Sequence, residues 1–134
     1  MTTHASGTFE VKFDHEETVD NAAGIARMTI NKVYHGDLEA TSKGEMIATM
    51  ETNRSGAYAA IERVTGTLSG RGGSFVLLHK GTMTSEGQQL SVTVVPGSAK
   101  GGLEGLAGEM GINIVDRKHF YELDYTLPGV TKVD

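Results

Sequence analysis

Period-two alternation of apolar and polar residues, interrupted by short turn clusters, runs through most of the 134-residue chain. In the segment Thr8-Phe9-Glu10-Val11-Lys12-Phe13, for example, the three apolar side chains fall on one face and the charged ones on the other. This period is typical of half-buried strands, and no segment shows a sustained helical period with a capping residue. The alternating runs cover approximately residues 8–13, 25–35, 38–50, 58–68, 73–83, 90–95, 103–115 and 119–127.

Eight strands joined by short links predict an antiparallel sheet that either closes into a barrel or splits into a sandwich. Several runs exceed ten residues, which tilted barrel strands can do and sandwich strands rarely do. We therefore expect one all-β domain over residues 1–134, a single eight-stranded antiparallel β-barrel, with a β-sandwich as the alternative. Gly44, Gly66 and Gly81 are expected at corners or bulges. Segments 14–21 and 98–102 are expected to be links.

Composition excludes several classes of function. The chain has no Cys, so a disulfide framework, a thiol nucleophile and a Cys-ligated metal are impossible. Its net charge of −5 has the wrong sign for a protein that neutralises phosphates, so we expect no nucleic-acid partner. No apolar run approaches a membrane span, and the N-terminus lacks the features of a signal peptide, so we expect a soluble, cytoplasmic protein without a membrane partner. The His spacing predicts no metal site.

Six segments together resemble a bacterial family of proteins of unknown function. They are residues 5–11, 36–39, 62–77, 79–81, 94–98 and 121–125. That family is similar in fold to the plant allene oxide cyclases, which are eight-stranded antiparallel barrels that work without a cofactor. The resemblance supports the barrel, implies self-association and implies no cofactor. The active-site motif of the plant cyclases has no positional match in this chain, so none of their catalytic residues is transferred, and fold similarity alone does not establish function.

The turn at residues 69–72 predicts the register of the hairpin around it. If Leu68 faces Gly73, then Glu62 faces His79 across an antiparallel pair, with both side chains pointing into the barrel. The same register places Tyr58 opposite Met83.

A carboxylate beside an imidazole in an apolar lumen is a candidate catalytic pair. Burial would raise the pKa of Glu62 and lower that of His79, while a charged partner would oppose both shifts. Such a pair could act as a general base or proton shuttle near neutral pH, and either residue could carry the proton. The alternative interpretation is a polar pair that fixes the strand register.

Other inward-facing residues are candidates for contacts with a ligand. Tyr side chains combine a wide apolar body with one hydroxyl, and the five internal Met residues suggest an adaptable lining. Packed core residues would show the same pattern. The predicted ligand-binding set is Tyr58, Phe75, Leu77, Met46, Tyr121 and Tyr125.

These features favour a cofactor-free barrel whose apolar lumen binds a small hydrophobic molecule. If it is an enzyme, we expect an isomerase, cyclase or lyase that moves a proton with Glu62 and His79, as in a carbon-acid reaction of the Kemp-elimination type. The alternatives are a lipocalin-like binding protein without catalysis and a packed structural barrel. Apolar residues on the predicted outer face indicate a symmetric homo-oligomer, most simply a dimer. They are Ile25, Ile47, Ile61, Val76 and Leu78.

Overall fold

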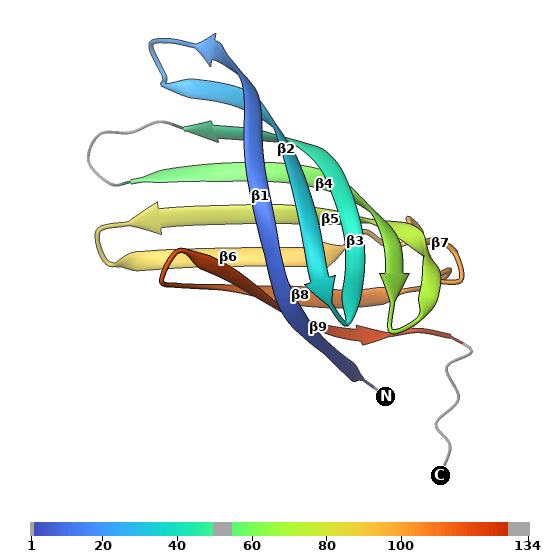
Figure 1. The fold of residues 1–134 in the computed structure, drawn as a ribbon. Helices are drawn as coiled ribbons and strands as arrows, with labels where there is room; N and C mark the ends of the chain where they lie inside the picture. The colour runs from blue at the N-terminus through green and yellow to red at the C-terminus, as the bar shows by residue number, and fades with distance from the viewer. Residues whose placement is uncertain (1, 50–54, 129–134) are drawn as a thin grey trace.

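The computed structural model describes residues 2–49 and 55–128, and over this part of the chain it is built from strands and turns (Figure 1). None of the described residues forms a helix long and apolar enough to cross a membrane. The strands are β1 (Thr3–Asp20), β2 (Ile25–Gly36), β3 (Leu38–Thr49), β4 (Gly56–Leu68), β5 (Arg71–Thr84), β6 (Gly87–Val94), β7 (Lys100–Gly101), β8 (Ala107–Val115) and β9 (Lys118–Thr126).

Eight of these strands close into an antiparallel barrel in the order β1-β2-β3-β4-β5-β6-β8-β9, with β9 paired back to β1. The predicted barrel is confirmed, and the sandwich alternative is wrong. The two-residue strand β7 is an addition that pairs with β5. The strand pairing that closes the barrel is weakest between β6 and β8, where only one residue pair, Thr93 with Glu109, is in register.

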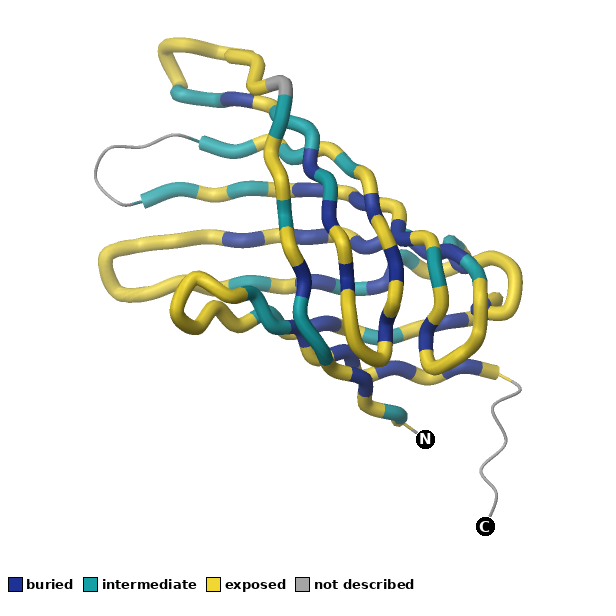
Figure 2. The backbone as a smooth tube through the Cα atoms, viewed as in Figure 1, coloured by how far each residue is buried: buried dark blue, intermediate teal, exposed yellow. Residues whose placement is uncertain are grey.

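The two ends of the barrel differ. At one end the strands spread apart, and the β1–β2, β5–β6 and β8–β9 links project from it (Figure 1). Buried residues concentrate toward the other end, where the turns Leu103–Leu106 lie (Figure 2). Leu103 and Leu106 are 1% and 2% exposed and pack with Phe75, Leu77 and other inward residues into the core. The core therefore fills one end of the barrel and leaves the other end wide.

Several predicted element boundaries are wrong, since β1 begins at Thr3, β6 begins at Gly87 and the expected link 98–102 contains β7. The polar segment 14–21 belongs almost entirely to β1, because it continues the antiparallel ladder with β2 despite register shifts between Asp14 and Glu17 and between Thr18 and Asp20. Both of its faces are largely exposed, so it needs no alternation (Figure 2). The run predicted over residues 103–115 begins as a strand only at 107, since residues 103–106 form turns in the core.

The predicted register of the β4–β5 hairpin is also wrong, by two residues. Ser69 and Gly70 have φ angles of 48° and 87°, which makes them the two central residues of a tight hairpin turn. Leu68 therefore pairs with Arg71 rather than with Gly73.

The corrected register changes the partners across the strands but not the faces. Glu62 pairs with Leu77, and His79 pairs with Ala60. Tyr58 likewise lies opposite Gly81 and not Met83. A shift of two residues keeps every side chain on its original face of the sheet, so Glu62 and His79 still share the inner face as diagonal neighbours.

The glycines inside the strands are points of close approach rather than bulges. The ladders from β2 through β6 run without a register shift. A Cβ atom on Gly44 would lie 2.2 Å from the Ile61 carbonyl oxygen and 2.6 Å from Glu62 Cα. The absence of a side chain at Gly44, which pairs with Ile30 on one side and Glu62 on the other, leaves room on the inner face beside Glu62.

Candidate functional site

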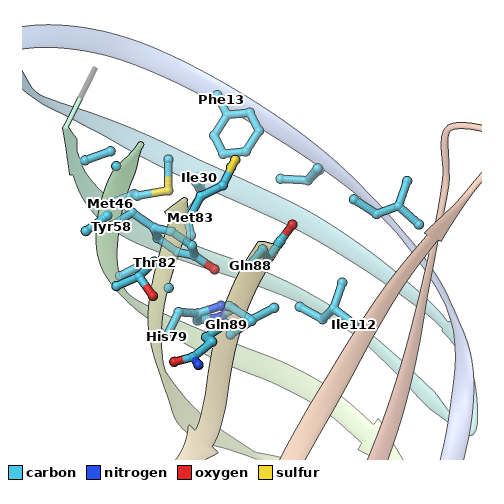
Figure 3. A pocket seen from close by; sticks show the side chains of 18 of the residues that line it. Phe13, Ile30, Met46, Tyr58, His79, Thr82, Met83, Gln88, Gln89 and Ile112 are labelled. Atoms are coloured by element: carbon cyan, nitrogen blue, oxygen red, sulfur yellow. The ribbon is translucent and has the colours of Figure 1, made fainter. Parts of the chain in front are cut away.

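A cavity of about 860 Å³ occupies the wide end of the barrel (Figure 3). Most of its wall is apolar, and Phe13 and Met83 at its rim are 52% and 49% exposed, so the cavity reaches the surface. Three of its polar side chains form what we call the cavity floor: the buried Lys32 of β2 and His79 of β5, and the half-buried Tyr58 of β4. Apolar residues of the wall include Phe9, Val11, Ile30, Met46, Leu90 and Ile112.

Glu62 lies directly behind this floor and is fully buried. Its Oε1 accepts hydrogen bonds from Lys32 Nζ at 2.9 Å and from His79 Nε2 at 2.5 Å. Its Oε2 accepts a hydrogen bond from the Tyr34 hydroxyl at 2.9 Å. One carboxylate thus holds three donors from two other strands, and the ammonium and imidazole groups meet at a single oxygen atom.

These donors decide the ionisation of Glu62. Burial by itself would raise the pKa of the carboxyl, but the hydrogen bond from His79 and the charge and hydrogen bond of Lys32 outweigh it and lower the pKa from 4.5 to about 2. Burial and a charged partner thus act on the Glu62 pKa in the expected opposite directions, and Lys32, a partner not predicted from the sequence, helps to make the net shift downward. Burial and the neighbouring Glu62 charge also raise the pKa of Tyr34 well above 10.

Because Glu62 is ionised, His79 must donate through Nε2, and a neutral imidazole then carries its lone pair on Nδ1. Nδ1 makes no hydrogen bond to any group in residues 2–49 and 55–128, and His79 lines the cavity. The Tyr58 ring lies beside it, with 6.4 Å between the ring centroids. Gly81 pairs with Tyr58, and a Cβ atom there would be 2.5 Å from the phenol ring, so this glycine makes room for it.

Lys32 is the cation of the floor. Its side chain is 6% exposed and lines the cavity, and its ammonium lies 4.7 Å from the centre of the Phe9 ring and 5.7 Å from that of Tyr34. A buried ammonium needs such partners, and the Glu62 carboxylate supplies the charge that balances it. Lys32 of the floor and Glu62 behind it thus form a compensated ion pair, with the His79 imidazole and the Tyr58 phenol beside it.

The structure brings together only part of the predicted site. Met46, Tyr58 and His79 line the cavity, and Glu62 supports it from behind. The predicted ligand contacts Phe75, Leu77 and Tyr125 are instead buried core residues outside the cavity lining. The Tyr121 hydroxyl is used structurally, since it accepts a hydrogen bond from Leu38 N and donates to the His35 carbonyl oxygen.

Sequence reasoning missed Lys32 and Tyr34. The signal was present, because both residues continue the inward-facing positions of β2 that include Ala26 and Ile30. To predict that they contact Glu62 from the sequence, one would also have had to reason that an inward-facing Lys needs a buried carboxylate as its partner. Among the described residues, no three His, Asp or Glu side chains gather as a metal site would require.

The acid stability of the protein should depend on Glu62. A folded-state pKa of about 2, below the ordinary 4.5, means that the carboxylate stabilises the fold above pH 4.5 and that this contribution is lost as the pH falls through 2. The contribution corresponds to roughly 3 kcal/mol. Urea unfolding of the parent protein and of Glu62→Gln across this window should show a steeper loss of stability in the parent. Parallel pH profiles would contradict the prediction.

The fold and the site define a small closed antiparallel β-barrel with a half-filled lumen and a buried charge network beneath its cavity. A family model described as a protein of unknown function, DUF3224, matches residues 5–125, and the chain belongs to this family. The structure is similar to the crystal structure of a protein with unknown function from the DUF3224 family of Shewanella oneidensis MR-1. The identity is 42% and the TM-score 0.88, and the match covers 95% of this chain and 98% of the other. No curated protein matches the sequence.

Proposed function

We propose that this protein binds a small hydrophobic molecule in the cavity at the wide end of the barrel. The observation that carries the proposal is a cavity of about 860 Å³ with a mostly apolar wall and a few convergent polar groups at its floor. Ligand sites for small molecules usually have this size and this division between apolar wall and polar anchor. The wall would supply affinity through burial of apolar surface, and Lys32, Tyr58 and His79 would orient the ligand.

Binding is testable with phenylnaphthylamine, a neutral apolar dye whose fluorescence rises in a dry environment. We expect saturable binding of one dye per chain. Ala60 and Ala59 are neighbours on β4, but Ala60 lines the cavity whereas Ala59 is exposed on the outer face. Ala60→Phe should therefore weaken binding at least about tenfold, equivalent to 1.4 kcal/mol, and Ala59→Phe should leave it unchanged.

A second cavity variant protects this test against misfolding. Ala48 lines the cavity nearer its rim and is only half-buried, so Ala48→Phe tolerates the larger ring more easily than Ala60→Phe does. Circular dichroism should show that each variant keeps its strand signal. Equal dye affinity in the parent protein and in both folded cavity variants would contradict the proposal.

Proton transfer to or from carbon is a second candidate function, favoured by the bond between Glu62 and His79. A carboxylate that fixes the tautomer of an imidazole is a recurrent arrangement in general-base catalysis. We assign the role of base to His79 for two reasons. The Glu62 carboxylate accepts three hydrogen bonds and has a pKa of about 2, so it is a weak base, and it does not line the cavity. Nitrobenzisoxazole, opened by a Kemp elimination, is a suitable probe. His79→Gln should remove the roughly 10²–10⁴-fold contribution of general-base catalysis.

We also propose that the outer face of β3, β4 and β5 contacts a second copy of the chain. Ile47, Ile61 and Leu78 are 49%, 56% and 42% exposed, and Ile61 pairs directly with Leu78. Ile25 and Val76 are half-buried and add less to this surface. Exposed apolar side chains grouped in this way favour an interface, and two-fold dimers are the commonest closed assembly.

Light scattering should therefore give twice the chain mass of 14.2 kDa at micromolar concentration. Ile61→Lys should shift the mass toward that of a single chain, because a charge would have to be buried in the interface. Lys12→Gln, a change at an exposed position on β1 and thus outside these three strands, serves as the control. A parent mass of 14.2 kDa would contradict the dimer.

A further inference from the structure

The cavity floor has an uneven set of hydrogen-bonding groups, and this set restricts the ligand. A neutral His79 offers one acceptor, Nδ1, because its Nε2–H donates to the ionised Glu62. Lys32 has three N–H donors and gives one of them to Glu62, and the Tyr58 hydroxyl can also donate. A complementary ligand group must therefore donate one proton and also accept hydrogen bonds. A hydroxyl group does both, whereas a ketone or an ether has no proton for Nδ1.

Charge balance specifies the kind of hydroxyl. The charges of Lys32 and Glu62 cancel, so with a neutral His79 the floor and Glu62 together carry no net charge. If the ligand O–H bond breaks and its proton joins the Nδ1 lone pair, the electron pair stays on the ligand oxygen. The imidazolium and the ligand oxyanion then also cancel each other. The transfer thus places no uncompensated charge in the cavity, in contrast to the entry of a ligand that is already ionised.

The neighbours of His79 support an ion pair at this place. Glu62 and Tyr58 face it from β4, and Lys32 approaches from β2 through the shared Glu62 oxygen. On β6 its partner is Val92, which does not titrate. His119 of β9 lines the same cavity against the Phe9 ring. The Glu62 carboxylate stabilises an imidazolium through Nε2–H, and the Lys32 ammonium stabilises an oxyanion beside it.

This inference rests on the proposed binding function and names its ligand class. We infer that the cavity takes an apolar molecule with a weakly acidic hydroxyl group, a phenol or an enol, and holds it as the oxyanion with its proton on His79 Nδ1. Glu62 acts as a positioning residue that sets the tautomer and does not touch the ligand. The same arrangement would stabilise the enolate formed when a carbon acid loses its proton.

The test uses para-nitrophenol, whose oxyanion absorbs visible light, and para-nitroanisole, the matched ether that lacks the proton. With excess protein, the absorption band of the bound phenolate should appear at a pH about 1–3 units below that of the free phenol, the usual effect of an opposite charge at close range. The ether should bind more weakly. His79→Gln should return the titration of the bound phenol to its free value. His35→Gln, at an exposed outer position, should not change it.

Two further measurements keep the inference falsifiable. If His79→Gln fails to fold, nitrogen NMR of the parent protein should show protonation of the His79 Nδ1 atom when para-nitrophenol is added. Dye binding is measured in parallel on the same samples. Bound para-nitrophenol with an unchanged pKa, or with a shift that His79→Gln retains, would overturn the oxyanion inference and leave the binding function standing. Failure of the dye and of both nitro compounds to bind would overturn the binding function and this inference with it.

Discussion

Glu62→Leu should destabilise the barrel by about 3–5 kcal/mol, the cost of removing one partner from a buried ion pair. Leu fills a similar volume to Glu but has no carboxylate. The Lys32 ammonium, the Tyr34 hydroxyl and the His79 N–H therefore lose their acceptor. Lys32 is 6% exposed, so its limited contact with solvent through the cavity cannot replace the lost carboxylate.

A double-mutant cycle separates the charge from the packing. Lys32→Met removes the ammonium, and the double variant Lys32→Met, Glu62→Leu removes both charges. The double variant should be considerably more stable than the sum of the two single effects predicts, because neither charge is left alone. Urea unfolding of the parent, the two single variants and the double variant at neutral pH gives the coupling free energy between Lys32 and Glu62.

An exposed ion pair provides the control. Arg27 and Glu17 form one between β2 and β1, with side chains about half exposed, and Glu17→Gln should cost no more than about 1 kcal/mol. If Glu62→Leu were as mild as Glu17→Gln, the buried network would be dispensable to the fold. Additive single effects would mean that Lys32 and Glu62 act independently.

Phe75→Ala should destabilise the protein by about 3–5 kcal/mol, and Val76→Thr, at the next position, by roughly 0.5 kcal/mol or less. Phe75 is 1% exposed and packs in the core that fills one end of the barrel, whereas Val76 is half-buried on the outer face. Urea unfolding measures both effects. The reversed ranking would mean that the inner and outer faces of β5 have been interchanged.

The same variant distinguishes core from cavity. Phe75 does not line the cavity, so folded Phe75→Ala should bind phenylnaphthylamine with the affinity of the parent protein. Tyr58 lines the cavity and is only half-buried, and a substitution there should change binding with a smaller loss of stability. A large loss of dye affinity in folded Phe75→Ala would return Phe75 to the ligand-binding set.

The sequence by itself determined the strands and their faces. Alternation at period two fixes which side chains share a face, so Glu62, His79, Phe75 and Leu77 could be placed inside the barrel and Ile61 outside without coordinates. The length of the runs and the short links between them were enough to favour closure into a barrel. Even the wrong hairpin register kept these faces, because it was wrong by two residues.

Only the tertiary structure decided the depth and the partner of each inward side chain. Alternation shows which face a side chain lies on but not its position along the barrel axis. From the sequence, Phe75 in the filled end and His79 in the cavity lining were therefore simply two inward-facing residues. The left-handed turn at Ser69 and Gly70 set the hairpin register.

The pairing of β3 with β2 on one side and with β4 on the other brought Lys32 and Tyr34 of β2 to Glu62 of β4, about thirty residues away in the chain and separated from it by β3. The ionisation of Glu62, and with it the choice of His79 Nδ1 as the group that faces a ligand, depends on those long-range contacts. The charge state of a buried group is set by all the atoms around it, whereas alternation describes only neighbours within one strand.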